Sequence, residues 1–144
     1  MAESLNSKAL EQLSMEMVYH RFLMGRREVR RFMDGLGTVE FIILSMALTC
    51  ERKYLKDIAK DLEMPMNEVA HAVERLKDKG LVIWTHDGYG VDGTYIMVNE
   101  TGREVAEEHK KKMIAYYEKI LDEVTDEEIM TFMTVLRKLT NLLK

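Results

Sequence analysis

The sequence predicts a mainly α-helical protein with one small β-hairpin. The chain has 144 residues, 47% hydrophobic and 32% charged, which is typical of a globular domain with a buried core. Its single proline and 8 glycines favour long helices. Two segments, 81–85 and 95–98, are rich in β-branched and aromatic residues, and the Asp-Gly pairs between them predict a hairpin with a long tip.

The stretch from Leu55 to Gly102 organises the rest of the chain. Apolar residues at helical spacing predict two short helices on either side of a turn at 63–66, and Gly80 ends the second helix. A helix, a turn, a second helix and a hairpin make a winged helix-turn-helix, whose second helix normally enters the DNA major groove. The apolar positions are Ile58, Ala59 and Leu62 in the first helix and Val69, Ala72, Val73 and Leu76 in the second.

Longer helices are predicted on both sides of this unit. Residues 6–32 carry an apolar stripe that includes Leu10, Leu13, Met17 and Met24. A buried helix is expected at 39–48, with Thr38 as its N-cap, and residues 50–53 form a polar connector.

Capping boxes at Thr101/Glu104 and Thr125/Glu128 predict two further helices, 102–124 and 126–143. Both ends of the chain therefore carry apolar helical stripes. These stripes either pack on each other or pair with a second copy of the chain, and we expect the homodimer.

Five groups of residues recur without a gap in their spacing: Asp57-Ile58-Ala59 with Leu62, Val69, Val73-Glu74-Arg75-Leu76, Lys79-Gly80-Leu81-Val82, and Asn99-Glu100-Thr101-Gly102-Arg103. Together they resemble the MarR family of bacterial transcriptional regulators. The resemblance implies one domain over residues 1–144, with a winged helix-turn-helix core at 37–101 and dimerisation helices at 1–36 and 102–144. It also implies double-stranded DNA as a partner and a small phenolic or aromatic-acid effector.

No catalytic, cofactor or metal site is expected. The 4 histidines form no zinc-binding motif, and Cys50 is the only cysteine. Residues 88–93 match G-x-G-x-x-G, but a strand rather than a helix follows, so a dinucleotide site is not predicted. Cys50 is interpreted as a small, partly buried residue and Trp84 as a packing anchor. No apolar run reaches the roughly 20 residues of a membrane span, and a reducing cytoplasm is the expected location.

The predicted DNA-binding surface is unusually acidic. Residues 55–103 include 6 basic and 9 acidic side chains, and no lysine or arginine lies between Leu81 and Glu100. Affinity for DNA comes largely from lysine and arginine on phosphates, whereas side chains on base edges supply specificity. The residues predicted to contact DNA are Asn67, Glu68, His71, Arg75, Lys77, Lys79 and Tyr89.

Three functional interpretations follow. In the first, the chain is a dimeric DNA-binding regulator, expected to be a repressor, whose affinity for DNA is set by a ligand. Alternatively, it is a protein-binding scaffold, which an acidic winged unit with an exposed Met66 would suit, or mainly a small-molecule sensor. The basic residues from Arg21 to Arg31 either add to a DNA surface or form a solvated helix face. The candidate effector residues are Tyr19, Arg21 and Arg26.

Overall fold

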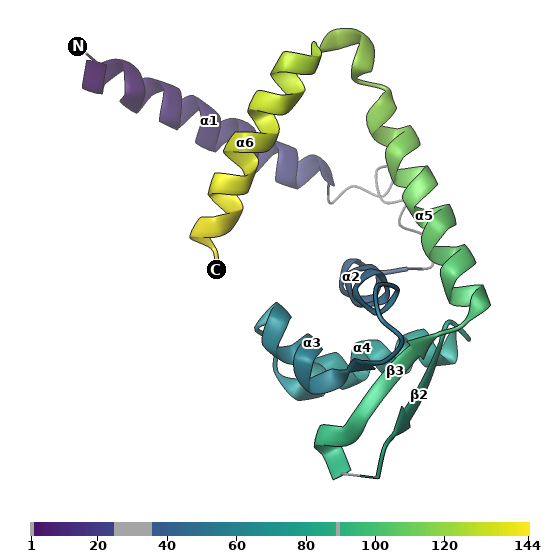
Figure 1. The fold of residues 1–144 in the computed structure, drawn as a ribbon. Helices are drawn as coiled ribbons and strands as arrows, with labels where there is room; N and C mark the ends of the chain where they lie inside the picture. Colours follow the sequence, from purple (N-terminus) through teal and green to yellow (C-terminus); the bar gives the residue numbers. More distant parts are fainter. Residues whose placement is uncertain (1, 25–35, 89) are drawn as a thin grey trace. The chain divides into compact units, whose positions relative to one another are not determined.

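The computed structural model of the chain describes residues 2–24, 36–88 and 90–144, and Figure 1 shows the order of its elements. Residues up to His109 form one compact unit and residues 110–144 a second one. None of the helices in this described part combines the length and the apolar character of a membrane span.

The helix-turn-helix is confirmed, and it is built around one apolar core. The side chains of Ile43, Leu44, Ile58, Val69 and Leu76 are fully buried in it. Because these residues recur at helical spacing on three different helices, each helix turns one stripe inward. The three helices are α2 (Thr38–Ala47), α3 (Leu55–Leu62) and α4 (Met66–Asp78).

The sheet has three strands rather than the two that the sequence predicted. The third strand, β1, pairs antiparallel with β3, so that Tyr54 lies opposite Tyr95 and the strand order is β1-β3-β2. The predicted polar connector at 50–53 is therefore wrong for Lys53, which belongs to this strand. A strand of two residues is too short to leave an alternating pattern in the sequence. The strands are β1 (Lys53–Tyr54), β2 (Val82–His86) and β3 (Thr94–Val98).

Two of the three predicted N-caps are wrong by one or two residues. The N-cap of α2 is Gly37 rather than Thr38, and the Glu40 carboxylate accepts a hydrogen bond from the Gly37 amide at 3.2 Å. Helix α5 begins at Glu100, ahead of the predicted Thr101 box. Asn99 caps it instead, because its Oδ1 accepts from the Gly102 amide at 2.7 Å.

The third capping box is confirmed. The Glu128 amide donates to Thr125 Oγ1 at 3.1 Å, and the Thr125 amide donates to Glu128 Oε1 at 3.0 Å. Both amides at the start of α6 therefore have a side-chain partner, directly after the 3₁₀ turn at Leu121–Glu123.

The start of α5 is fixed against the base of the wing. Asn99 Nδ2 donates to the Gly80 carbonyl at 2.8 Å. Gly102 is buried, and a Cβ atom there would overlap the Leu81 carbonyl oxygen and come within 2.8 Å of Val98 Cγ1. Only glycine allows this close approach of helix to strand.

The outer helices differ from their predicted bounds mainly at their ends. Helix α1 begins at Ala2 rather than residue 6 and is described as far as Met24, so the predicted end at residue 32 lies outside the described residues. The predicted helix 102–124 stops at Glu118. The three outer helices are α1 (Ala2–Met24), α5 (Glu100–Glu118) and α6 (Asp126–Leu142).

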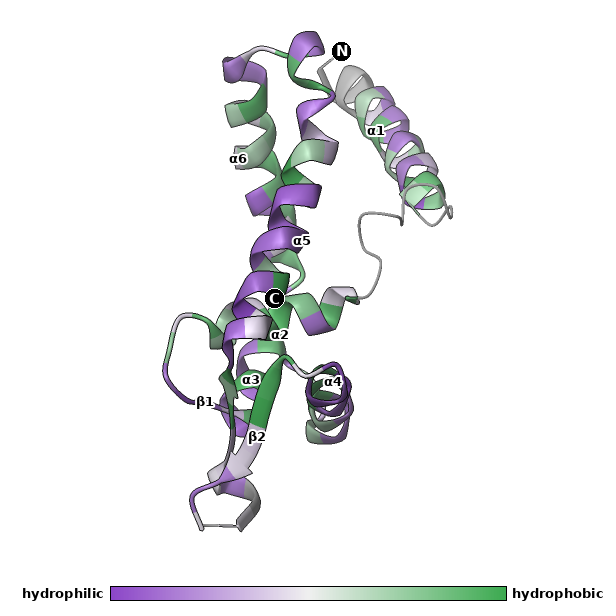
Figure 2. Ribbon diagram, turned by 90° about the vertical axis from the view of Figure 1, so that its right-hand side faces the viewer, coloured by the Kyte–Doolittle hydropathy of each residue, from purple (hydrophilic) through white to green (hydrophobic). Residues whose placement is uncertain are grey.

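Large apolar side chains remain exposed on α1 and α6, where hydrophobic residues lie among hydrophilic ones in Figure 2. Phe22 is 66% exposed and Phe132 is 65% exposed. The others include Leu10, Val18 and Tyr19 on α1 and Met130, Val135 and Leu136 on α6.

The turn between α3 and α4 contains a backbone conformation that is unfavourable for its residue. Glu63 ends α3 with φ 53° and ψ 45°, the left-handed region. It is the one residue other than glycine with positive φ in the described parts of the chain. A Cβ atom in this region costs about 1 kcal/mol.

We predict that Glu63→Gly stabilises the protein by about 1 kcal/mol, because glycine removes the Cβ penalty at positive φ. Urea denaturation measures the free energy of unfolding. Glu63→Gln is the matched control, since it removes the charge but keeps the Cβ. An equal gain from both variants would show that the charge, not the backbone, is responsible.

Candidate nucleic-acid interface

Helix α4 turns one face into the core and leaves the opposite face exposed. Val69, Ala72, Val73 and Leu76 are fully buried. The exposed residues opposite them follow a spacing of four, three and four, so they form one row along the helix. This outer row consists of Asn67, His71, Glu74 and Asp78.

The outer row is the part of α4 that a recognition helix would present to base edges. It contains two carboxylates and neither lysine nor arginine. The predicted residues Asn67 and His71 belong to its first two turns, and Glu68 is exposed beside them. The structure therefore brings together three of the predicted contact residues on an acidic face.

The remaining predicted residues fall into two groups. Lys77, Arg75 and Lys79 are exposed on the flanks of α4, with Lys77 on the opposite side from the other two. Tyr89 lies outside the described residues. The expectation that Met66 is exposed is wrong, because Met66 is partly buried and packs against the core.

Arg75 and Lys79 both bind a buried carboxylate, that of Glu40 on α2. Arg75 Nε lies 2.7 Å from Glu40 Oε1, and Lys79 Nζ lies 2.5 Å from Glu40 Oε2. The Glu40 side chain is only 6% exposed. With the Gly37 amide as a third donor, its carboxylate accepts three hydrogen bonds.

Glu40 is not among the predicted site residues, although the sequence indicates that its carboxylate needs a partner. Glu40 is the only charged residue between Thr38 and Thr49, in a helix that is otherwise almost entirely apolar. A carboxylate in a buried helix needs cationic partners. Basic residues four apart on one flank of α4, Arg75 and Lys79, meet that need.

The pKa of Glu40 lies below its ordinary value. Burial by itself raises the pKa, because it disfavours the charged form, but the hydrogen bonds from Lys79, Arg75 and the Gly37 amide lower it further than burial raises it. Glu40 is therefore a carboxylate that compensates one of the two positive charges on this flank of α4.

Arg75 nevertheless keeps donors for another partner. Its side chain is 53% exposed, and only its Nε binds Glu40. Lys79 is 37% exposed. Each cation is thus held in place by Glu40 while part of it stays in contact with solvent.

The wing tip is held by its own backbone and by β1. The Asp87 amide donates to the Gly93 carbonyl at 3.1 Å, and the Gly88 amide donates to His86 Nδ1 at 3.2 Å. Tyr54 Oη donates to Asp87 Oδ2 at 3.2 Å. Strand β3 follows Gly93 directly, which confirms that the G-x-G-x-x-G match lacks the helix of a dinucleotide site.

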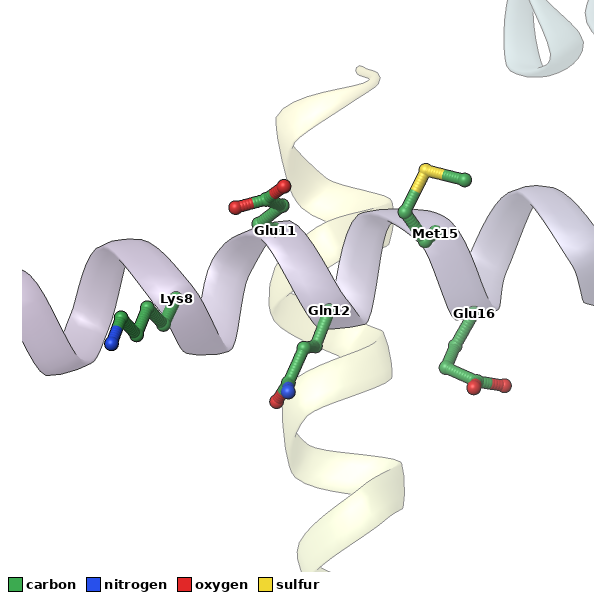
Figure 3. A pocket seen from close by; sticks show the side chains of 5 residues that line it. All are labelled: Lys8, Glu11, Gln12, Met15 and Glu16. Atoms are coloured by element: carbon green, nitrogen blue, oxygen red, sulfur yellow. The ribbon is translucent and has the colours of Figure 1, made fainter.

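The candidate effector residues are not joined by a described pocket. Tyr19 and Arg21 are exposed on α1, and Arg26 lies outside the described residues. Figure 3 shows a shallow pocket that is lined by other residues of the same helix. Its side chains project from α1 in two rows instead of converging: Lys8, Glu11, Gln12, Met15 and Glu16.

Two remaining expectations have different outcomes. Cys50 is exposed, so the expectation that it is partly buried is wrong. Trp84 is partly buried against the core, as expected of a packing anchor. In the described parts of the chain, no group of three or more histidine, cysteine, aspartate or glutamate side chains has an arrangement able to hold a metal ion.

Several solved structures have this arrangement of helices and strands, some of them over nearly the whole chain. A MarR family protein from Bacillus stearothermophilus is 21% identical, with a TM-score of 0.72 over 95% of this chain and 96% of that one. The chain has the MarR fold. No family model matches the sequence, and no curated protein matches it either.

Two further solved structures with this fold are of proteins that bind DNA. FabT from Streptococcus pneumoniae, in complex with DNA, is 19% identical, with a TM-score of 0.61 over 99% of this chain and 97% of that one. BpsR from Bordetella bronchiseptica, whose DNA binding is regulated by 6-hydroxynicotinic acid, is 19% identical, with a TM-score of 0.63 over 77% and 81%.

We predict that Glu40→Gln lowers the free energy of unfolding by about 2 kcal/mol near neutral pH, because hydrogen bonds to a charged group are lost. The pH dependence follows from the lowered pKa of Glu40. Its contribution is fully present above the unfolded-state value of about 4.3 and is lost as the pH falls through the folded-state pKa.

The difference between wild type and Glu40→Gln should therefore shrink on acidification. Urea titrations at several pH values measure it. Glu74→Gln, which removes an exposed carboxylate from the outer row, serves as the control and should change stability by less than about 0.5 kcal/mol. A gap that stays constant down to pH values well below the ordinary glutamate range would contradict the role of the charge.

Proposed function

We propose that the chain is a MarR-type transcriptional regulator, a homodimer that binds duplex DNA through α4 and represses by occluding a promoter. The observation that carries this proposal is a complete winged helix-turn-helix in which the outer row of α4 stays exposed. FabT, which has the same fold, binds DNA.

Each predicted residue has a specific role in this proposal. Asn67 pairs with adenine, and Glu68 accepts a hydrogen bond from the amino group of cytosine. His71 donates to a base or a phosphate. Arg75 uses its free guanidinium nitrogens on a phosphate while Glu40 holds its Nε.

Lys77, Lys79 and Tyr89 complete the set. Lys77 makes no ion pair within the described residues, so its whole charge is available to a phosphate. Lys79 contributes less, since it shares Glu40 with Arg75. We propose that Tyr89, which lies outside the described residues, contacts the minor groove or a sugar of the DNA backbone.

The exposed apolar side chains of α1 and α6 support the homodimer. Large apolar side chains left exposed in number often mark a protein–protein interface, and two copies are needed to read a palindromic operator. The large exposed residues, among them Phe22 and Phe132, would be covered by the partner copy.

A small aromatic acid is the effector class that we propose. BpsR, a protein with the same fold, is regulated by 6-hydroxynicotinic acid. Tyr19, Arg21 and Arg26 provide one aromatic and two basic side chains for such a ligand. The effector would act by changing the separation of the two α4 helices, which couples its binding to that of DNA.

The acidic outer row favours a second candidate function. Glu74 and Asp78 carry its only formal charges, and the recognition helix would present both to a polyanion. A basic segment of a partner protein would bind such a row better than DNA does. The second candidate is therefore a winged-helix scaffold for a cationic protein.

We predict that the protein binds duplex DNA with affinity that falls steeply with salt. Three phosphate contacts weaken binding at least about 40-fold between about 50 and 200 mM salt, since each contributes about 0.9 to the logarithmic slope. Fluorescence anisotropy with a mixed-sequence duplex and with the region upstream of the chain's own coding sequence measures this. Lys77→Gln should reduce the slope by about 0.9, and Lys111→Gln is its control.

If the folded protein, without effector, binds no duplex at about 50 mM salt, the DNA-binding proposal is wrong. The scaffold would then be the better description. If the wild type binds DNA and Lys77→Gln binds it with the same salt slope, then only the assignment of Lys77 to the interface is wrong.

We also predict sedimentation at twice the chain mass of 16.8 kDa at micromolar concentration. Phe132→Glu should dissociate the dimer without unfolding the chain, because Phe132 is exposed in the single copy. Thr131→Glu places the same charge on the neighbouring exposed residue and is the control. A wild-type species at the mass of one chain would rule out the homodimer.

A further inference from the structure

Two cations lie at the edge of the sheet, away from α4, and are held by aromatic rings. The guanidinium carbon of Arg52 lies 4.7 Å from the centroid of the Tyr95 ring, and Lys56 Nζ lies 5.9 Å from the centroid of the Tyr54 ring. Both side chains are exposed on their other sides. They flank β1, the strand that the sequence did not predict.

The two rings are themselves fixed. Tyr54 and Tyr95 lie opposite each other in the β1–β3 pairing, with ring centroids 5.4 Å apart. Tyr95 is buried, and the Tyr54 hydroxyl donates to Asp87 at the beginning of the wing tip. The rings thus form a rigid support that links the edge of the sheet to the wing.

This support positions the cations without neutralising them. A tyrosine ring attracts a cation through its quadrupole but carries no net charge. No ion pair joins Arg52 or Lys56 to a carboxylate of the described residues. In contrast, Arg75 and Lys79 share Glu40, and Lys53 pairs with Asp61 at 3.3 Å.

Charges of both signs lie close in sequence to the two cations, and Glu51, directly before Arg52, is exposed. Lys60 follows Lys56 by one turn on the same row of α3, whereas Asp57 and Asp61 occupy the adjacent row. Asp61 is engaged by Lys53, and Asp87 accepts the Tyr54 hydroxyl. Arg52, Lys56 and Lys60 thus share a short segment with the exposed carboxylates of Glu51 and Asp57.

We propose that Arg52 and Lys56, held by Tyr95 and Tyr54, bind the backbone phosphates of duplex DNA. This inference rests on the proposed function and names a second contact region for it. The wing carries no lysine or arginine of its own, and the tyrosine pair places these two cations beside its base. The edge of the sheet takes over the phosphate contacts that a basic wing would make.

The test compares DNA binding by the double variant Arg52→Gln/Lys56→Gln with that by wild type. Removing two phosphate contacts should lower the logarithmic salt slope by about 1.8. Raising the salt from about 50 to about 200 mM should then weaken binding by the variant about tenfold less than binding by the wild type. The control, Lys111→Gln/Lys112→Gln, removes the same charge from α5 and should leave the slope unchanged.

A charge-preserving double variant separates a specific contact from a folding defect. Arg52→Lys/Lys56→Arg should bind DNA with the wild-type slope. Tyr54→Phe keeps the ring that holds Lys56 but loses the hydrogen bond to Asp87, so it should bind DNA more tightly than Tyr54→Leu, which removes the ring as well. Circular dichroism and thermal unfolding verify that each variant is folded.

The possible outcomes are distinct. If the wild type binds DNA and Arg52→Gln/Lys56→Gln binds it with the same logarithmic salt slope, this inference is overturned and the proposed function stays intact. If the control Lys111→Gln/Lys112→Gln lowers the salt slope by the same amount, the effect depends only on the net charge of the protein, and the inference is also overturned. Wild type that binds no duplex at all overturns both.

Discussion

The buried carboxylate of Glu40 links the two helices on which the winged unit depends. It comes from α2, accepts the Gly37 amide at the start of its own helix, and binds Arg75 and Lys79 on α4. Once a carboxylate is buried, its partners are not optional, because an unpaired charge in the interior is costly. The angle of α4 and the start of α2 are therefore fixed by the same group.

This constraint also determines the charge on the candidate DNA surface. The carboxylate that stabilises α4 compensates part of the positive charge on that helix, and the outer row contributes Glu74 and Asp78. Aromatic rings hold Arg52 and Lys56 at the sheet edge, and these two cations, like Lys77 on α4, make no ion pair within the described residues.

Much of the fold could be predicted because its information is local. The stripe of Val69, Val73 and Leu76 defines α4 within a few residues, and the β-branched segments define β2 and β3. The capping box at Thr125 is equally local. The errors concern features that depend on distant neighbours: strand β1 exists only because β3 pairs with it, and Met66 is covered only when α4 packs.

The sequence by itself determined the order of the helices, the hairpin, the α4 residues that face outward and the absence of lysine and arginine from the wing, because periodicity and composition are properties of the chain. Only the tertiary structure decided which cations are compensated. Arg75 and Arg52 look alike in the sequence, yet one binds Glu40, 35 residues away, and the other lies over Tyr95. Charge compensation depends on distances between elements, and packing of the core sets those distances.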